Sequence, residues 1–343
     1  MLTRKNLFVA VLLFVAVKIH SQQHKVDSLT IALKKYNEKH KGKILSLADT
    51  LKVNLLSDLY YYTVNYEPDN AFNYATESLE ISKKIKYRKG VAFAYADLAR
   101  IHSSRANFAL ALESLKNSNK IFLELKDNLQ IAHNDSQIGV ILSKKGNFPE
   151  AVSNFFKALK GYENAGEELS VGYTYVNIGI SYKQRKEYKQ ALEYYNTALK
   201  IFKKLNTVDS RFGTAGTYSN IGNIYLEQGN YEKSLETLHK SLKLAEEFEN
   251  PYQFAESYQS IGENYLKLGK YDTALEAYSK AIDYCNEISD KSGIANSNIN
   301  SGYCYFKKGN TQKAISNINF GLAIAKETGI LLWQKKKQTS NET

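Results

Sequence analysis

Apolar residues recur along this chain at intervals of three and four positions, the spacing that places them on one face of a helix. One such stripe runs from Val171 to Tyr182, and a second follows from Tyr188 to Phe202. A short polar break at Lys186-Glu187 separates them. The alternation typical of strands is missing, so the pattern predicts two helices joined by a tight turn.

The same two-helix pattern returns at a nearly constant distance. Each copy carries a small residue in its first helix and another twelve positions later in its second. The first set is Ala99, Gly139, Gly179, Gly222, Gly262 and Gly302, and the second is Ala111, Ala151, Ala191, Ser234, Ala274 and Ala314. The period is 40 residues except for 43 between Gly179 and Gly222, and a weaker copy begins at Asp58. About seven copies at such a period are typical of a solenoid.

The glycines carry two structural predictions. A glycine inside a helix costs about 1 kcal/mol relative to alanine, so we expect the small residues of the two helices to face each other where the backbones cross closely. In four copies the break between the helices also holds a glycine, as at Gly146, which suits a helix C-terminus. The extra residues near Gly213 and Gly216 predict a longer turn and a bend in the array.

These motifs resemble a known family. Leu/Ile-Gly-x-x-Tyr followed by the spacing of Ala191, Tyr195 and Ala198 is similar to the tetratricopeptide repeat, in its extended version with a period near 40. The resemblance covers residues 50–328, although the family's usual tryptophan is missing. It implies an all-α, right-handed superhelical solenoid of antiparallel helix pairs with about seven repeats. Residues 23–49 then predict a capping helix, and residues 329–343 a capping segment with a polar tail.

The N-terminus predicts export. Arg4 and Lys5 precede an eleven-residue apolar run, Leu7 to Val17, which is too short to span a bilayer comfortably. Residues 1–22 therefore read as a signal peptide, and the alternative is an uncleaved membrane anchor. We expect a periplasmic or cell-envelope protein. In an exported protein the net charge of +11 points to acidic peptides, anionic glycans or phospholipid head groups instead of nucleic acid. We interpret it first as a solvated, lysine-rich helical surface, with these ligands as the alternative.

The sequence offers no convincing catalytic or metal-binding constellation. It contains no phosphate-binding glycine loop, no Gly-x-Ser-x-Gly elbow, and no histidines at metal-ligand spacing. Cys285 and Cys304 predict two buried thiols, with a disulfide as the alternative in an exported protein. The Lys335 to Lys337 run is interpreted as a solvated end, and a weak membrane-surface contact is the alternative. We therefore expect no enzymatic activity, cofactor or metal.

The family resemblance implies a concave groove lined by the first helices, which would bind a protein or peptide segment. The positions it assigns to this groove hold Arg100, Lys144, Asn177, Lys183, Asn220, Asn223, Glu227, Glu256, Glu263 and Asn300. Three asparagines share one slot, and an amide that both donates and accepts can pair with an extended backbone. The early repeats present basic residues and the late repeats acidic ones, so we expect a partner segment of opposite polarity.

Three functions remain open from the sequence. The leading interpretation is a non-catalytic exported scaffold that binds a peptide or protein segment. The second is an extracytoplasmic sensor or input module, truncated or acting in trans, because the stretch from Ala48 to Ile85 resembles the repeat arrays of bacterial two-component histidine kinases and similar transcriptional regulators. The third is a scaffold for assembly of the cell envelope.

Overall fold

The computed structural model describes residues 24–41, 46, 49–64, 66–248 and 250–327, and in these residues it contains helices and turns but no strand. The predicted signal peptide over residues 1–22 and the predicted C-terminal segment over 329–343 lie outside the described residues. A helix over residues 24–39 precedes the repeats. The all-α class is therefore confirmed over the part of the chain that can be described.

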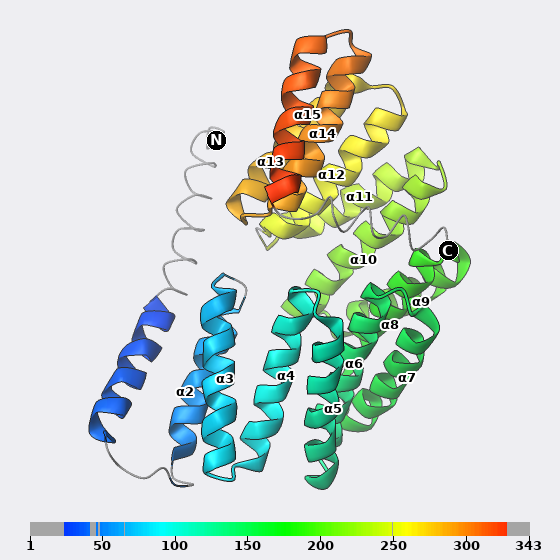
Figure 1. The fold of residues 1–343 in the computed structure, drawn as a ribbon. Coiled ribbons are helices and arrows are strands. Elements are labelled where there is room, and N and C mark those ends of the chain that lie inside the picture. Colours follow the sequence, from blue (N-terminus) through cyan, green and yellow to red (C-terminus); the bar gives the residue numbers. More distant parts are fainter. Residues whose placement is uncertain (1–23, 42–45, 47–48, 65, 249, 328–343) are drawn as a thin grey trace. The chain divides into compact units, whose positions relative to one another are not determined.

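The chain divides into two compact units, one ending at Ser170 and the other beginning at Val171. Short turns join successive helices into antiparallel pairs (Figure 1). The first unit contains α2 (Thr50–Thr63), α3 (Pro68–Lys84), α4 (Arg88–Ser104), α5 (Phe108–Glu124), α6 (Asn128–Lys144) and α7 (Phe148–Ala165). Helix α8 (Glu168–Gln184) begins just before the boundary. The second unit continues with α9 (Tyr188–Leu205), α10 (Val208–Glu227), α11 (Tyr231–Glu246), α12 (Pro251–Lys267), α13 (Tyr271–Glu287), α14 (Lys291–Lys307) and α15 (Thr311–Glu327).

The turn inside each pair from α4–α5 to α14–α15 uses the left-handed backbone conformation. The predicted glycines adopt it: Gly146, Gly229, Gly269 and Gly309 have φ between 71° and 85°. Asn230 N then donates to the carbonyl of Tyr225 (2.8 Å), which closes the end of α10. The prediction that these glycines end helices is confirmed. Ala106 and Lys186 adopt the same conformation without glycine, at φ 58° and 61°, where a side chain makes it less favourable.

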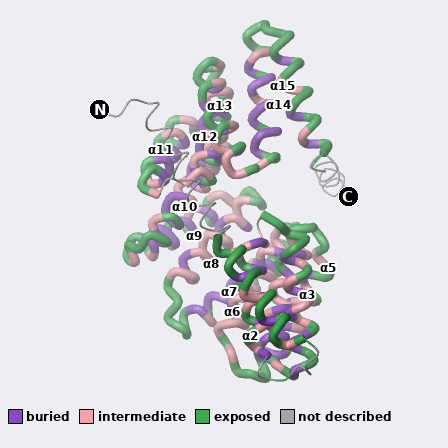
Figure 2. Tube along the Cα trace, turned by 90° about the vertical axis from the view of Figure 1, so that its left-hand side faces the viewer, coloured by how far each residue is buried: buried purple, intermediate pink, exposed green. Residues whose placement is uncertain are grey.

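The helix glycines make room for a large side chain of the partner helix. A Cβ on Gly179 would lie 2.5 Å from the ring of Tyr195, and one on Gly222 would lie 2.8 Å from Leu238 Cγ. Both large residues are fully buried, and Figure 2 shows how buried positions recur along each helix. The expectation that small residue faces small residue is thus incomplete. The partner that fills the glycine site lies sixteen positions later, while Ser234 Oγ donates to the carbonyl of Gly222 (2.8 Å).

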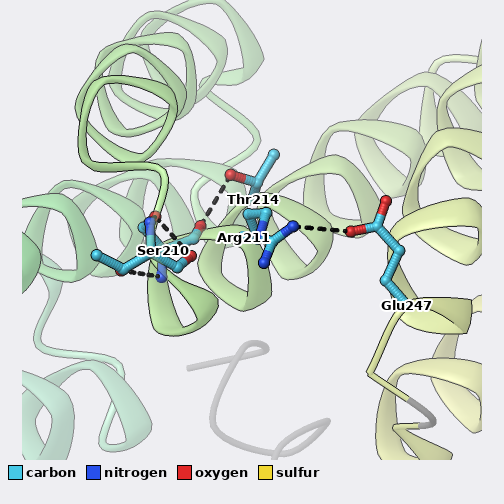
Figure 3. Close-up of polar contacts among 5 residues, drawn as sticks. Ser210, Arg211, Thr214 and Glu247 are labelled. Carbon is cyan, nitrogen blue, oxygen red and sulfur yellow. Dashed lines mark hydrogen bonds and ion pairs between the residues drawn. The ribbon is translucent and has the colours of Figure 1, made fainter.

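The three extra residues lengthen a helix rather than a turn. Thr207 caps α10 by accepting from Ser210 N (3.2 Å), and Thr207 N donates to Ser210 Oγ (2.9 Å). Thr214 Oγ1 donates to the carbonyl of Ser210 (2.9 Å), one turn into the same helix (Figure 3). Gly213 and Gly216 therefore lie inside α10, which has 20 residues. The predicted longer turn is wrong, because the capping box starts the helix early.

Buried hydroxyls tie the first helices to the second helices at matching places in the two units. Ser118 Oγ donates to the carbonyl of Ala92 (2.8 Å) in the first unit. Ser241 Oγ makes the equivalent bond to Ala215 (2.9 Å) in the second. A buried polar group without a partner is costly, so these bonds restrict how one helix can rotate against the next. They help to fix which side chains of the first helices face outward.

Candidate functional site

The first unit carries two predicted groove residues, Arg100 on α4 and Lys144 on α6, and both are exposed. The structure adds Asp97, which the sequence analysis missed. Burial raises the pKa of its carboxyl to about 7, and the nearby Arg100 opposes that rise. Asp97 stands two positions before Ala99, the slot that holds asparagine in later repeats. This repeat position could have marked Asp97 as a groove residue, but it does not reveal that the carboxyl is buried.

In the second unit, neighbouring first helices bring two predicted residues together. Lys183 Nζ on α8 lies 3.5 Å from Glu227 Oε1 on α10. Tyr188, at the start of α9, donates its hydroxyl proton to Glu227 Oε2 (2.9 Å). The side chains that follow the helix glycine by four and five positions therefore meet across successive repeats. Glu227 is consequently engaged within the chain, which limits its availability to a partner.

Glu256 on α12 belongs to the same neighbourhood. Its side chain is exposed, yet surrounding protein removes part of its hydration and raises the pKa of the carboxyl, while Lys183 acts in the opposite direction. Glu227 and Glu256 both add to the effect of burial in raising the pKa of the Tyr195 phenol. Within the described residues, the buried hydroxyl of Tyr195 has no hydrogen-bond partner. Acidic side chains and an unsatisfied hydroxyl thus gather along α8 to α12.

A pocket of about 470 Å³ lies farther along this surface, between α12 and α14. It brings together two predicted residues, Glu263 and Asn300. Tyr303 and Lys307 also line it, and Lys307 Nζ lies 5.3 Å from the centre of the Tyr303 ring. The remaining lining residues, which the sequence analysis did not select, are Leu266, Lys267 and Tyr271. The pocket combines a carboxylate, an amide, two ammonium groups and two phenols.

The other predicted asparagines are partly buried on the first helices. Asn220 Nδ2 donates to the carbonyl of Gly216 within α10 (3.1 Å), so one amide donor is already used. Asn177 and Asn223 are also half-buried. The predicted charge gradient sets Arg100, Lys144 and Lys183 against Glu227, Glu256 and Glu263, and it stays a prediction. The groove assignment likewise remains a proposal that binding experiments must test.

The described residues contain no group of three or more histidine, cysteine or acidic side chains arranged to hold a metal ion. Cys285 and Cys304 are buried and free, so the interpretation as two thiols is confirmed. Burial raises the pKa of each thiol to about 11, with Asp290 adding to the effect at Cys285. No helix in the described part of the chain is both long enough and apolar enough to cross a bilayer.

Comparison with known proteins identifies the family. The tetratricopeptide repeat profile matches residues 130–204, 213–287 and 253–327, which is more than half of the chain. The chain therefore belongs to the tetratricopeptide repeat family. No curated protein sequence matches it.

Several solved structures share the fold. Aspartyl phosphate phosphatase F from Bacillus subtilis is 19% identical, with a TM-score of 0.60 over 81% of this chain and 73% of that one. A Rap protein in complex with competence and sporulation factor is 16% identical, with a TM-score of 0.61 over 91% and 98%. The apo quorum sensor NprR from B. thuringiensis is 13% identical, with a TM-score of 0.54 over 89% and 99%. At these identities the likeness concerns the fold.

Proposed function

We propose that this chain is a non-catalytic, exported scaffold that binds an extended segment of a partner protein along its first helices. The observation that carries the proposal is the pocket in which Glu263 of α12 meets Asn300 of α14. It joins polar side chains from successive repeats on one surface. The ion pair between Lys183 and Glu227 likewise joins first helices of successive repeats, α8 and α10.

The repeat geometry suits an extended chain. Packed helices lie about 8–10 Å apart, and an extended strand rises about 3.3 Å per residue. One amide slot per repeat would therefore meet about every third residue of a bound segment. Asn177, Asn220 and Asn300 occupy that slot, and Ser260 stands there in the repeat between the last two. Amide groups at this interval can pair with main-chain N–H and C=O groups of any sequence.

Two structural relatives support a protein or peptide ligand. One is a Rap protein complexed with competence and sporulation factor, and another is a quorum sensor. We propose a partner of the same broad class here. A third relative, aspartyl phosphate phosphatase F, is a phosphatase. The polar groups described above are better suited to holding a ligand than to activating a nucleophile, so we propose no catalysis, cofactor or nucleic-acid partner.

The identity of the partner distinguishes this proposal from its alternatives. We propose that residues 1–22 direct the chain to the periplasm or cell envelope, where its partner would be found. In the alternative, the chain is an input module that acts in trans on a signalling protein. A crosslinked complex with a membrane-bound kinase in the envelope fraction would favour that alternative. A complex of several envelope-assembly proteins would favour the assembly scaffold.

The test begins with peptides selected from a displayed random library on the purified protein. Their affinities are then measured by fluorescence polarisation. Glu263→Ala and Asn300→Ala should each weaken a selected peptide by about two- to tenfold, the loss of roughly one hydrogen bond. Glu276→Ala and Asn286→Ala are the matched controls, because both residues are exposed on the second helix α13. Unchanged affinity in the first pair, or an equal loss in the controls, would contradict the proposed surface.

A further inference from the structure

A second pocket, of about 550 Å³, lies in the first unit between α3, α4 and α5. Four cationic side chains line it, and the single carboxylate among the lining residues is Glu124. The cations are Lys83 and Lys86 at the end of α3 and in the turn after it, Arg88 on α4, and Lys120 on α5. Glu124 forms an ion pair with Arg88. Three ammonium groups therefore remain around the pocket with no carboxylate of the lining to neutralise them.

The local geometry holds these groups at the pocket and leaves them accessible. Lys83 Nζ lies 5.2 Å from the centre of the Tyr95 ring, which also lines the pocket. Lys86 occupies the turn in the left-handed conformation, at φ 58°. Among the described residues, no carboxylate forms an ion pair with Lys83, Lys86 or Lys120. Three cations that line one pocket repel one another, and an anion bound between them relieves this repulsion.

Much of the same arrangement recurs in the second unit. Lys203 Nζ lies 5.8 Å from the centre of the Tyr218 ring. Arg211 Nη1 lies 3.3 Å from Glu247 Oε2, and Figure 3 draws this ion pair. Lys243 occupies the position that corresponds to Lys120.

The repeat that follows the first pocket keeps lysines at two of the four positions, Lys126 and Lys160, but lacks the other two cations. Leu123 and Asn128 stand there in place of Lys83 and Arg88. The repeat architecture alone therefore does not require the cations at the positions of Lys83 and Arg88. Lys203 and Arg211 restore these two cations in the second unit, where Asn206 stands in place of Lys86. Their return is an observation independent of the pocket itself.

We propose that the pocket between α3, α4 and α5 binds a small soluble molecule that carries at least two phosphate-type negative charges. Lysine ammonium groups bind phosphate oxygens as mobile point charges. The pocket volume falls within the range of about 300–1,000 Å³ that is common for small-molecule sites. The phenol of Tyr95 offers a further donor or acceptor. A pocket bounded by three helices favours a compact ligand over the flat surface of a membrane.

The test uses inorganic pyrophosphate and isothermal titration calorimetry at low salt, because exposed charges are screened by added salt. Lys86→Gln with Lys120→Gln removes two pocket cations. Lys126→Gln with Lys160→Gln is the matched control. Its residues occupy the same two positions one repeat later, both are exposed, and Lys126 also adopts the left-handed conformation, at φ 56°. The two double variants change the net charge equally, and circular dichroism checks that both remain folded.

Pyrophosphate should bind the wild type with a Kd of about 1 mM or tighter. The pocket variant should bind about tenfold more weakly, the loss of roughly one charge-assisted hydrogen bond. The control should stay within about twofold, since exposed lysines outside a site contribute little. An equal loss in both variants, or no binding to the wild type, would overturn the proposal. Sedimentation with phosphatidylglycerol vesicles tests whether the phosphate groups of a membrane are the ligand instead. Binding to these vesicles without binding to pyrophosphate would also overturn the proposal.

Discussion

Two glycines in the same helix should respond to alanine in opposite directions. Replacing a helical glycine by alanine stabilises a helix by about 1 kcal/mol when the new methyl group has room. At Gly216 the added Cβ would meet only Gln253 Oε1, at an ordinary 3.5 Å. At Gly222 it would lie 2.8 Å from Cγ and 2.9 Å from Cδ2 of Leu238, a fully buried side chain. Overpacking of this kind costs about 1–3 kcal/mol.

Gly216→Ala should therefore raise the free energy of unfolding by about 1 kcal/mol. Gly222→Ala should lower it by about 0–2 kcal/mol, because the packing cost offsets or exceeds the same helix gain. Urea unfolding followed by circular dichroism measures both. In a Leu238→Ala background, the penalty of Gly222→Ala should disappear. The reasoning is refuted if Gly222→Ala is as stabilising as Gly216→Ala, or if its effect does not depend on residue 238.

Three further predictions concern pH, thiols and export. The folded pKa of Asp97 is about 7, above the unfolded value of about 3.9. The contribution of Asp97 to wild-type stability should therefore fall as pH rises from 4 to 7. Asp97→Asn should raise the melting temperature at pH 8 but hardly change it at pH 4. An equal effect at both pH values would contradict the burial of Asp97. Iodoacetamide at pH 8 should label Cys285 and Cys304 only after unfolding, and rapid native labelling would count against buried thiols. Intact mass of the envelope-fraction protein should lack residues 1–22, whereas a full-length mass would support an uncleaved anchor.

The repeat and its helices could be predicted because they depend on local spacing. The period of the small residues defines the helix pairs, and the turn glycines follow from a backbone conformation that a single residue must adopt. The partner of a helix glycine was harder to predict. Whether Gly222 meets Ser234 or Leu238 depends on how one helix rotates against the other, which the period does not specify. The capping residues Thr207 and Ser210 indicate the early start of α10. The two glycines that follow, Gly213 and Gly216, were interpreted as a turn instead.

Part of the candidate site could also be predicted. The family resemblance assigned Lys183, Glu227, Glu263 and Asn300 to one face of the first helices. The structure pairs Lys183 with Glu227 and places Glu263 and Asn300 in one pocket. The pKa values of the acidic side chains in the site could not be predicted in the same way. The pKa of Asp97 depends on how much protein surrounds it, and sequence neighbours do not report that. The cationic pocket was missed because its side chains come from three helices and look like ordinary surface lysines.

Hydrogen–deuterium exchange on the complex with a selected peptide tests the proposed binding surface most directly. The peptide should slow exchange in the first helices of the second unit, α8, α10, α12 and α14, with the largest effect around Glu263 and Asn300. Amides of the second helices α11 and α13 should change little, since binding there would require the opposite face of each pair. Protection confined to α9, α11, α13 and α15, or spread evenly over both helices of every pair, would contradict the account.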